Sequence, residues 1–499
     1  MPVDYNQQAQ IAYLSFLANL DASEQEWVRT CRDYAEGNHP LYITERMKEF
    51  MGLKARNTVY PYAHNMCQLV IDCICERLSV EGWEAGNEGD GAENDMAALA
   101  PSWWTANGMD TQQDNLYAAA ARDASSYIIV DWDAGRGIPG WYQNDKYDGT
   151  QGVAVYTDPN TGAVVFAAKK WQVSDPYTGT NNGRTRMNLF FADRVEKYIS
   201  AQGSNRGVAG TQWEPFQDVG DTVWPIPWRG RDGAPLGCAV VPFDMPGGSV
   251  LTPVIPIQDM LNKADLDLIA TTDSAGFRIL WAAGMTPSID SSTGEEKAVN
   301  VGPGYMMRFT DPAGKLGALD PVDPALMIRS CHYWIESAAG ITRVPQYLLQ
   351  MAGADQPSGE SLKQQEVGLV ARATRCQEVF GAAWQQVMAL SARLYDVYNP
   401  PHIPREIAPM WKDASLAEPG GVIRQREAET LQAYVQAGMP LEAALKELGW
   451  DDERIAEVMD AKKRESEAQQ VTLGAAMARA QRHLDQNQPP TPGLGSDVA

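Results

Sequence analysis

The feature that most constrains this chain is the longest uninterrupted helical pattern in the sequence, from Leu362 to Tyr398. Its apolar residues are spaced alternately four and three apart, so they form one continuous stripe along a helix. The stripe consists of Leu369, Ala373, Cys376, Phe380, Ala383, Val387, Leu390 and Leu394. Ser358 is the expected N-cap, Glu360 adds negative charge to the first turn, and Pro400 ends the pattern. Two interpretations follow: a core helix spanning a large α+β enzyme, or a strut in an oligomer with its other face against a neighbouring subunit.

The charge balance limits the partners that such a chain can bind. It has 41 Lys and Arg against 64 Asp and Glu, a formal net charge of −23 over 499 residues. Binding of nucleic acid through its phosphates needs clustered Lys and Arg, so this surface could tolerate DNA but not grip it. The acidity could equally serve solubility alone. The length predicts two to four domains.

The cysteines and the hydropathy pattern indicate a reduced, cytosolic protein. The count of seven is odd and no C-x-x-C occurs, so we expect free thiols. The first residues lack the basic-then-apolar signature of a signal peptide. No stretch of about 18 apolar residues predicts a membrane span.

Helical and strand patterns alternate along the chain. We expect helices over residues 5–36, 60–78, 257–279 and 324–340, and short ones over 422–437, 440–448 and 452–467. Pro256 suits the first turn of one helix, and Asp323 followed by Pro324 is a strong start signal for another. Strands are expected over 80–83, 127–132, 153–156, 164–168, 189–192, 195–199, 238–243 and 305–309. A Pro/Gly turn over 158–162 predicts a hairpin. The last thirty or so residues have the composition of a disordered tail.

Motifs for catalysis are missing or incomplete. There is no P-loop, so ATP hydrolysis is not expected. One G-x-G-x-x-G occurs over 135–140, but no helical pattern follows it, so we interpret it as a glycine-rich loop. The five histidines show no metal-ligand spacing, and G-x-S-x-G is absent. A carboxylate pair for glycoside hydrolysis stays possible, with the 15 tryptophans as sugar-stacking surfaces, although aromatics more often serve packing.

Four separated strings, in the same order, resemble the portal proteins of tailed bacteriophages, in particular the group similar to the portal of SPP1-like phages. They cover residues 236–242 (LGCAVVP), 253–263 (PVIPIQDMLNK), 317–324 (GALDPVDP) and 357–363 (PSGESLK). The resemblance extends over roughly residues 10–465. It implies an α+β portal fold with long wing and stem helices, a mixed or antiparallel β wing region, a small α/β clip and a helical crown.

The resemblance also implies a division of the chain. Residues 1–252 would form the wing, 253–282 and 321–342 the two stem helices, 283–320 the clip, 343–357 the tunnel loop, 358–399 a long wing helix, 400–468 the crown and 469–499 a disordered tail. The tunnel loop would place Gln350, Met351, Gly353, Asp355 and Gln356 near DNA. The stem would present Lys263, Asp265, Asp267 and Asp273 to the channel, where the carboxylates would repel phosphate. The clip would dock terminase through Ser288, Asp290, Glu295, Glu296 and Lys297.

In this hypothesis the protein is not an enzyme and has no catalytic residue, cofactor or metal. The resemblance implies a homo-oligomeric ring, usually a dodecamer, at one capsid vertex of the virion, assembled in the cytoplasm of the host bacterium. Double-stranded DNA would pass through the ring. The other partners would be the terminase large subunit, a head-completion adaptor, and the major capsid and scaffold proteins, with no membrane. The alternative is a cytosolic carboxylate-dependent hydrolase whose β-rich region, 110–250, is catalytic. The first hypothesis predicts a large ring without turnover, and the second predicts a small oligomer with a carboxylate pair in a cleft.

Overall fold

The computed structural model divides the chain into two compact units, residues 1–415 and 416–499, which are described separately. The structure describes residues 22–40, 64–85, 95–174, 181–201, 212–218, 220–276, 280–283, 315–318, 323–349, 359–404 and 406–415 of the first unit. In the second unit it describes 430–432, 434–447, 455, 458–459 and 462–464.

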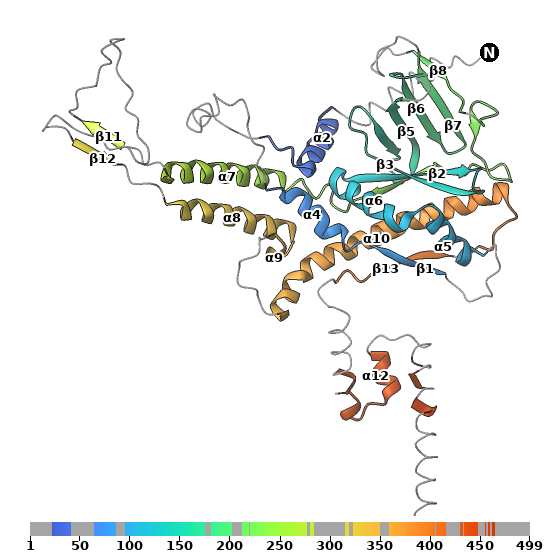
Figure 1. Cartoon of the computed structure of the whole chain (residues 1–499). Coiled ribbons are helices and arrows are strands. Elements are labelled where there is room, and N and C mark those ends of the chain that lie inside the picture. Colours follow the sequence, from blue (N-terminus) through green and yellow to red (C-terminus); the bar gives the residue numbers. More distant parts are fainter. Residues whose placement is uncertain are drawn as a thin grey trace, which may run out of the picture. The chain divides into compact units, whose positions relative to one another are not determined.

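Helix α10 (Gly359–Tyr398) runs through the first unit as the longest element of the described chain (Figure 1). All eight residues of the predicted stripe are buried, with at most 6% of their surface exposed. The prediction of this helix is therefore confirmed, and its start lies three residues before Leu362. The expected N-cap, Ser358, lies outside the described residues.

Three helices of the N-terminal half pack on this rod, α4 (Met66–Cys75), α5 (Met96–Ala106) and α6 (Met109–Asp123), and a fourth, α2 (Ala22–Glu36), packs on α6 and α4. Trp384 of α10 is the centre of an aromatic cluster, with ring centroids 4.9 to 6.3 Å from those of Trp83, Trp104, Trp141 and Phe243. Its indole N–H donates to the hydroxyl of Tyr117 at 2.8 Å. The predicted helix over 5–36 ends with α2 at Glu36, and the predicted helix over 60–78 contains α4, which is shorter at both ends. Helices α5 and α6 were not predicted.

A three-stranded antiparallel sheet packs on α10. Its order is β10 (Val240–Asp244), β2 (Ser125–Asp133), β3 (Ile138–Asp145). The G-x-G-x-x-G string spans the β2–β3 turn and the start of β3, and it opens no helix. This geometry confirms the glycine-rich loop and excludes a dinucleotide fingerprint, which needs a helix N-terminus at the phosphates.

A second, six-stranded antiparallel sheet follows the order β4-β5-β6-β7-β8, with β9 also paired to β7. Its strands are β4 (Gly152–Thr157), β5 (Val164–Gln172), β6 (Thr185–Phe191), β7 (Arg194–Ser200), β8 (Trp213–Pro215) and β9 (Ile226–Pro227). The predicted β4–β5 hairpin is confirmed: Asp158 accepts a hydrogen bond from the Asn160 amide at 2.8 Å, and Gly162 has φ +70°. One face of this sheet has a small core of its own, around Tyr147, Met187, Leu189, Tyr198 and Trp213.

The chain then forms α7 (Ile255–Gly276), β11 (Leu280–Ala283), β12 (Lys315–Ala318), α8 (Pro324–Thr342) and the short α9 (Gln346–Leu349). Asp323 caps α8 as predicted, since its carboxylate accepts from the Ala325 amide at 2.9 Å. Helix α8 ends at Thr342, two residues beyond the predicted end. After α10 the chain returns as β13 (Ile407–Trp411), which pairs antiparallel with β1 (Val80–Ala85).

These elements confirm a mixed fold of helices and antiparallel sheets. In the second unit, α12 (Leu441–Glu447) agrees with the expected helix over 440–448. The expected strand over 305–309, the helix over 5–21 and the tail lie outside the described residues. All seven cysteines are free, and six of them are buried. Within the described residues, no helix is long and apolar enough to span a bilayer.

Candidate functional site

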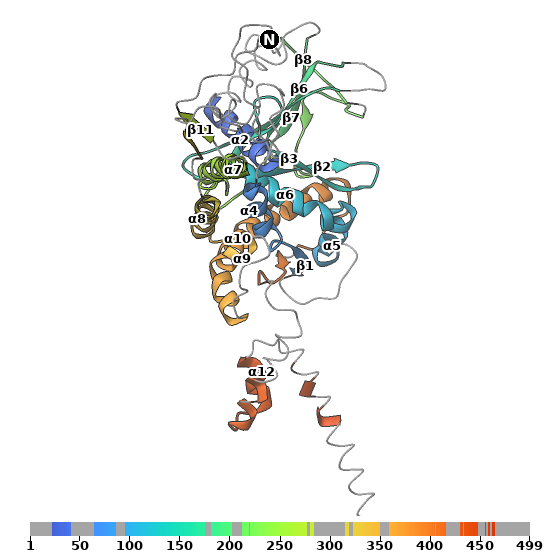
Figure 2. The ribbon, with the colours of Figure 1, turned by 60° about the vertical axis from the view of Figure 1, so that its left-hand side comes forward.

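The predicted stem corresponds to the antiparallel pair α7 and α8, which lie side by side in both views (Figures 1 and 2). Residues 277–323 connect the two helices along the chain, and this stretch includes β11 and β12. The function of this helix pair depends on which side chains pack between the helices and which stay exposed.

The first turns of α7 are anchored by a buried polar network. The side-chain oxygen of Gln258 accepts from the Met66 amide at 2.9 Å, and its nitrogen donates to the His64 carbonyl and to Asn262. The amide nitrogen of Asn262 lies 3.2 Å from Nδ1 of His39. Gln258 and Asn262 are buried, so each unmade bond would cost about 1–3 kcal/mol. This network ties α7 to the chain before and at the start of α4.

Asp265 belongs to this packing and does not lie on an exposed face. It is only 6% exposed, its Oδ2 lies 2.9 Å from Nδ1 of His64, and its Oδ1 accepts from the Cys331 thiol of α8 at 3.4 Å. Burial, and next the Asp265 carboxylate, raise the pKa of Cys331 to about 11, so the thiol stays protonated as a donor. The expectation that Asp265 repels DNA phosphate is corrected, because its carboxylate is directed into the helix pair.

Lys263 and Asp267 lie on the solvent side of α7, and they neutralise each other. Their side chains are 56% and 38% exposed and form an ion pair of 2.7 Å, one helical turn apart. Asp273 lies in α7, but its side chain is outside the described residues. The described part of this face therefore presents a neutral pair instead of a row of carboxylates.

The tunnel-loop and clip residues predicted above all lie outside the described residues. These are Gln350, Met351, Gly353, Asp355 and Gln356, and Ser288, Asp290, Glu295, Glu296 and Lys297. The structure does describe the contacts of the residues on either side of 350–358.

Glu366 of α10 holds the flanks of that segment. It is 4% exposed, accepts from the Tyr347 hydroxyl of α9, and lies 3.7 Å from the guanidinium of Arg77, which follows α4. A second link comes from Arg372, whose guanidinium donates to the Thr342 carbonyl at 3.1 Å. Sequence reasoning missed Glu366, although a signal was present: it lies three residues before Leu369, where the apolar stripe would continue.

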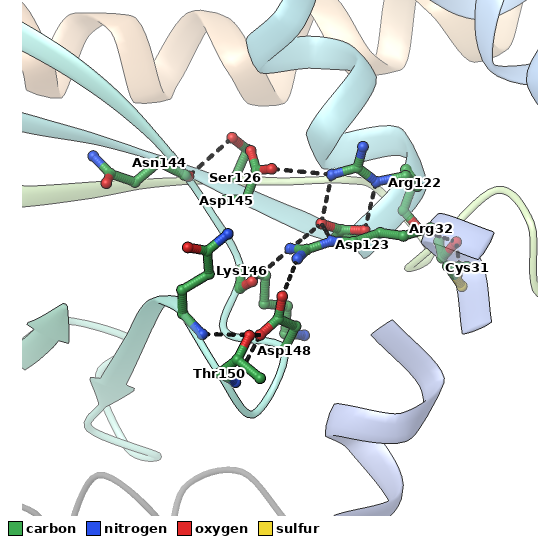
Figure 3. Close-up of polar contacts among 12 residues, drawn as sticks. Cys31, Arg32, Arg122, Asp123, Ser126, Asn144, Asp145, Lys146, Asp148 and Thr150 are labelled. Carbon is green, nitrogen blue, oxygen red and sulfur yellow. Dashed lines mark hydrogen bonds and ion pairs between the residues drawn. The ribbon is translucent and has the colours of Figure 1, made fainter. Parts of the chain in front are cut away.

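A polar cluster lies elsewhere, where α2, α6 and the end of β3 meet (Figure 3). Asp123, with a fully buried side chain, accepts from Arg32 at 2.8 Å and from Arg122 at 2.8 Å. Arg32 also donates to Asp148 at 2.6 Å and to the Lys146 carbonyl at 2.7 Å. This cluster joins segments that are far apart in the sequence.

These carboxylates are occupied by structural bonds. Partial burial by itself would raise the pKa of Asp148, but bonds from the Thr150 side chain, from the Gln151 and Thr150 amides and from Arg32 lower it. A general acid needs the opposite, a carboxyl with a raised pKa that faces a cleft. The cluster therefore gives the hydrolase alternative no support. Among the described residues, no group of three or more His, Cys, Asp or Glu could hold a metal ion.

Large apolar side chains remain on the outside of the helix pair. On α7, Met260 is 47% exposed, and on α8, Leu326, Ile328, Tyr333 and Ile341 are between 43% and 60% exposed. A single exposed apolar residue needs no explanation, whereas several on one helix pair indicate a surface that another molecule covers.

Comparison with known proteins adds an independent observation. No protein-family model matches the chain. The portal protein of Mycobacterium phage D29 is 24% identical over 444 residues, which cover 84% of this chain and 85% of that protein. The portal protein of Mycobacterium phage L5 is 24% identical over 452 residues, with the same coverage. These similarities support a phage portal protein.

Proposed function

We propose that this chain is a portal protein of a tailed phage, a structural ring subunit at one vertex of the capsid. The single observation that carries the proposal is the end-to-end similarity to two phage portal proteins, which covers 84% of this chain and 85% of each relative. Similarity over nearly the whole length favours a shared role for the whole chain over a shared module. In this role the ring passes double-stranded DNA during packaging and ejection, and it carries out no catalysis.

The elements take the following roles in the proposal. Residues 1–252 and 358–399 form the wing, α7 and α8 the stem, 283–320 the clip and 343–357 the tunnel loop. The crown begins after Ser415 instead of at 400, because β13 pairs with β1 in the first unit. The order helix, insert, helix, loop, rod is the one that the resemblance to the portals of SPP1-like phages implies, and the assignment to that group stays a proposal.

The surface of α7 suits a passage that must not hold its cargo. A duplex carries one negative charge per about 1.7 Å of its axis, so a row of lysines would bind it tightly. The Lys263–Asp267 pair instead presents opposite charges 2.7 Å apart, which lets phosphates pass without strong attraction or repulsion. Asp273 and the tunnel-loop residues Gln350, Met351, Gly353, Asp355 and Gln356 are proposed to lie along the same passage.

A ring of identical subunits needs heterologous contacts, in which one face of a subunit meets a different face of the next. The exposed apolar residues of α7 and α8 supply area for such contacts. The other proposed partners are the terminase large subunit at the clip, a head-completion adaptor, and capsid and scaffold proteins. The proposed location is the virion, after assembly in the host cytoplasm.

The test is negative-stain electron microscopy of the purified full-length chain, combined with its mass in solution. We expect rings with a central hole wide enough for duplex DNA, by themselves or after addition of the phage's scaffold and capsid proteins. Chains that stay monomeric with those proteins present would contradict the proposal.

A pair of variants makes the test specific to the helix pair. Leu326→Asp places a charge on the exposed apolar surface of α8, and we expect it to abolish rings while the chain stays folded. Glu84→Gln, on the exposed side of β1, is the matched control and should form rings like the wild type. Equal ring formation by both variants would remove α8 from the proposed interface.

A further inference from the structure

A hollow of about 760 Å³ lies between the three-stranded and the six-stranded sheets, outside the helix pair. Its walls include Asp131 of β2, Tyr142 of β3, Asn188 of β6 and Tyr398 at the end of α10. We call it the inter-sheet hollow. The proposed channel does not use it.

Among the described residues, Asp131 is the carboxylate in this hollow that forms no ion pair. Its carboxylate accepts a hydrogen bond from the neighbouring Trp132 amide, at 2.8 Å. The other two carboxylates in the walls are saturated: Asp218 pairs with Arg186 and Lys197, and Asp221 pairs with Lys197. Desolvation by the surrounding walls raises the pKa of Asp131, whose side chain is still accessible from the hollow.

The two lysines in the walls do not neutralise Asp131. The ammonium of Lys197 bonds to both Asp218 and Asp221, at 2.9 Å each. The ammonium of Lys169 lies 5.2 Å from the ring centroid of Trp171, which is the geometry of a cation–π contact. In the same wall as Lys169, the side-chain oxygen of Asn188 is buried without a hydrogen-bond donor among the described residues.

Aromatic rings flank Asp131. Residue 140, opposite Asp131 on β3, is glycine, and a side chain there would lie 2.9 Å from the Tyr142 hydroxyl. The glycine therefore allows the Tyr142 ring to lie beside the carboxylate. Tyr398 also lines the hollow and stacks on Trp132, with centroids 4.3 Å apart and planes 13° apart. Tyr398 is also the last residue of α10, and the C-terminal end of a helix attracts positive charge.

A carboxylate with no ion pair among the described residues, two tyrosine rings and a helix C-terminus in one hollow favour one ligand class. We propose that the inter-sheet hollow binds a guanidinium group, the arginine side chain of another protein chain, between Asp131 and Tyr142. A guanidinium is planar, stacks on aromatic faces and donates to a carboxylate through two N–H groups, whereas an ammonium does only part of this. The inference does not depend on the proposed ring, because the hollow lies within one subunit.

The test measures the binding of a probe, N-acetylarginine amide, to the full-length chain by ligand-observed saturation-transfer NMR. The neutral analogue N-acetylcitrulline amide, with nearly the same shape, is the control ligand. We expect the arginine probe to bind the wild type at least about tenfold more tightly than the citrulline probe. Equal binding of the two probes, or no binding of the arginine probe, would overturn the proposal.

Variants then assign the binding to the hollow. Asp131→Asn keeps the acceptor for the Trp132 amide, so the strand should fold, and it should weaken the arginine probe by roughly tenfold. Tyr142→Leu should weaken it severalfold, and Glu84→Gln should leave it unchanged. Unchanged affinity in both Asp131→Asn and Tyr142→Leu would place the probe elsewhere and refute the assignment.

Sedimentation of the wild type and Asp131→Asn distinguishes the source of the arginine. Weaker self-association of Asp131→Asn would assign the guanidinium to a neighbouring copy of this chain. Unchanged self-association, with weakened probe binding, would assign it to a different protein. Either outcome supports the hollow as a guanidinium site.

Discussion

Helix α10 and the pair α7–α8 have similar apolar periodicity in the sequence but differ in what covers that periodicity. Every stripe residue of α10 is buried within its own chain. On α7 the apolar residues Ile257, Leu261 and Ala264, spaced four and three apart, are buried and Leu268 is half-buried, while α8 leaves Ile328 43% exposed. Apolar periodicity therefore identifies a helix and its apolar face, but it does not indicate whether that face packs against the same chain or against another one.

The largest effect should come from removing a stripe residue of α10. Phe380→Ala deletes a fully buried ring that stacks on Tyr117, 5.2 Å away, and should cost about 3–5 kcal/mol of the free energy of unfolding. Chemical denaturation followed by tryptophan fluorescence measures this loss. Val379→Ala, next along the helix and 38% exposed, should cost less than about 1 kcal/mol. Equal losses would mean that the α10 stripe is not the core of the first unit.

A second variant changes a buried ion pair whose partners also lie within the same chain. Asp123→Asn removes the buried negative charge that pairs with the guanidiniums of Arg32 and Arg122. It should lower the free energy of unfolding by about 2–4 kcal/mol. The same denaturation experiment measures it, with Glu84→Gln as the exposed control. A loss no greater than that of the control would show that this cluster contributes little to holding α2 on α6.

Acid should weaken a third contact of the first unit. Partial burial would raise the pKa of Asp218, but bonds from Arg186 and Lys197 outweigh it and hold the pKa at about 2, below the ordinary value of 3.8 for an aspartate. Because the folded pKa is the lower one, this carboxylate stabilises the fold above about pH 4, and the contribution disappears as the pH falls toward 2.

The wild type should therefore lose more melting temperature between about pH 5 and about pH 3 than Asp218→Asn does. Melting curves at a series of pH values measure the difference. Parallel curves for the two proteins would mean that the Arg186–Asp218–Lys197 contacts do not stabilise the fold.

The smallest effect on the isolated chain should come from the surface of the helix pair. Tyr333→Ser changes a side chain that is 60% exposed and should alter the free energy of unfolding by less than about 0.5 kcal/mol. Its effect should appear in self-association, measured by sedimentation, because the residue is proposed to be covered by another subunit. A large loss of chain stability would show that this face of α8 is covered by its own chain. The two helical regions would then not differ in what covers their apolar residues.

The elements that were predicted from the sequence are those whose signals are local. The α10 stripe, the β4–β5 turn and the Asp323–Pro324 start of α8 each lie within a few residues of the structure that they specify. Helix α5 was missed because it has Pro101 inside it, and α6 because five of its eight buried residues are alanine, glutamine or aspartate, which leaves no continuous stripe of large apolar side chains. The pairing of β1 with β13 could not be predicted, since no local period indicates a partner in a distant segment.

The candidate site shows the same division. The sequence predicted α7 and put Lys263, Asp265, Asp267 and Asp273 together on a channel face, and in the structure Lys263 and Asp267 are exposed. It could not show that Asp265 is directed inward, because that depends on His64, about 200 residues earlier in the chain. It also missed Glu366, whose partners Tyr347 and Arg77 come from two other segments.

The β1–β13 pair has a consequence for synthesis of the protein. Val80 pairs with Trp411, about 330 residues later, so the edge of β1 has no partner until almost the whole first unit has left the ribosome. At about 5–20 residues per second, this interval lasts roughly 15–65 seconds. During that time β1 is an open strand edge next to a half-built core, the kind of surface through which nascent chains aggregate. Release of a correctly folded subunit therefore depends on the last strand of the unit.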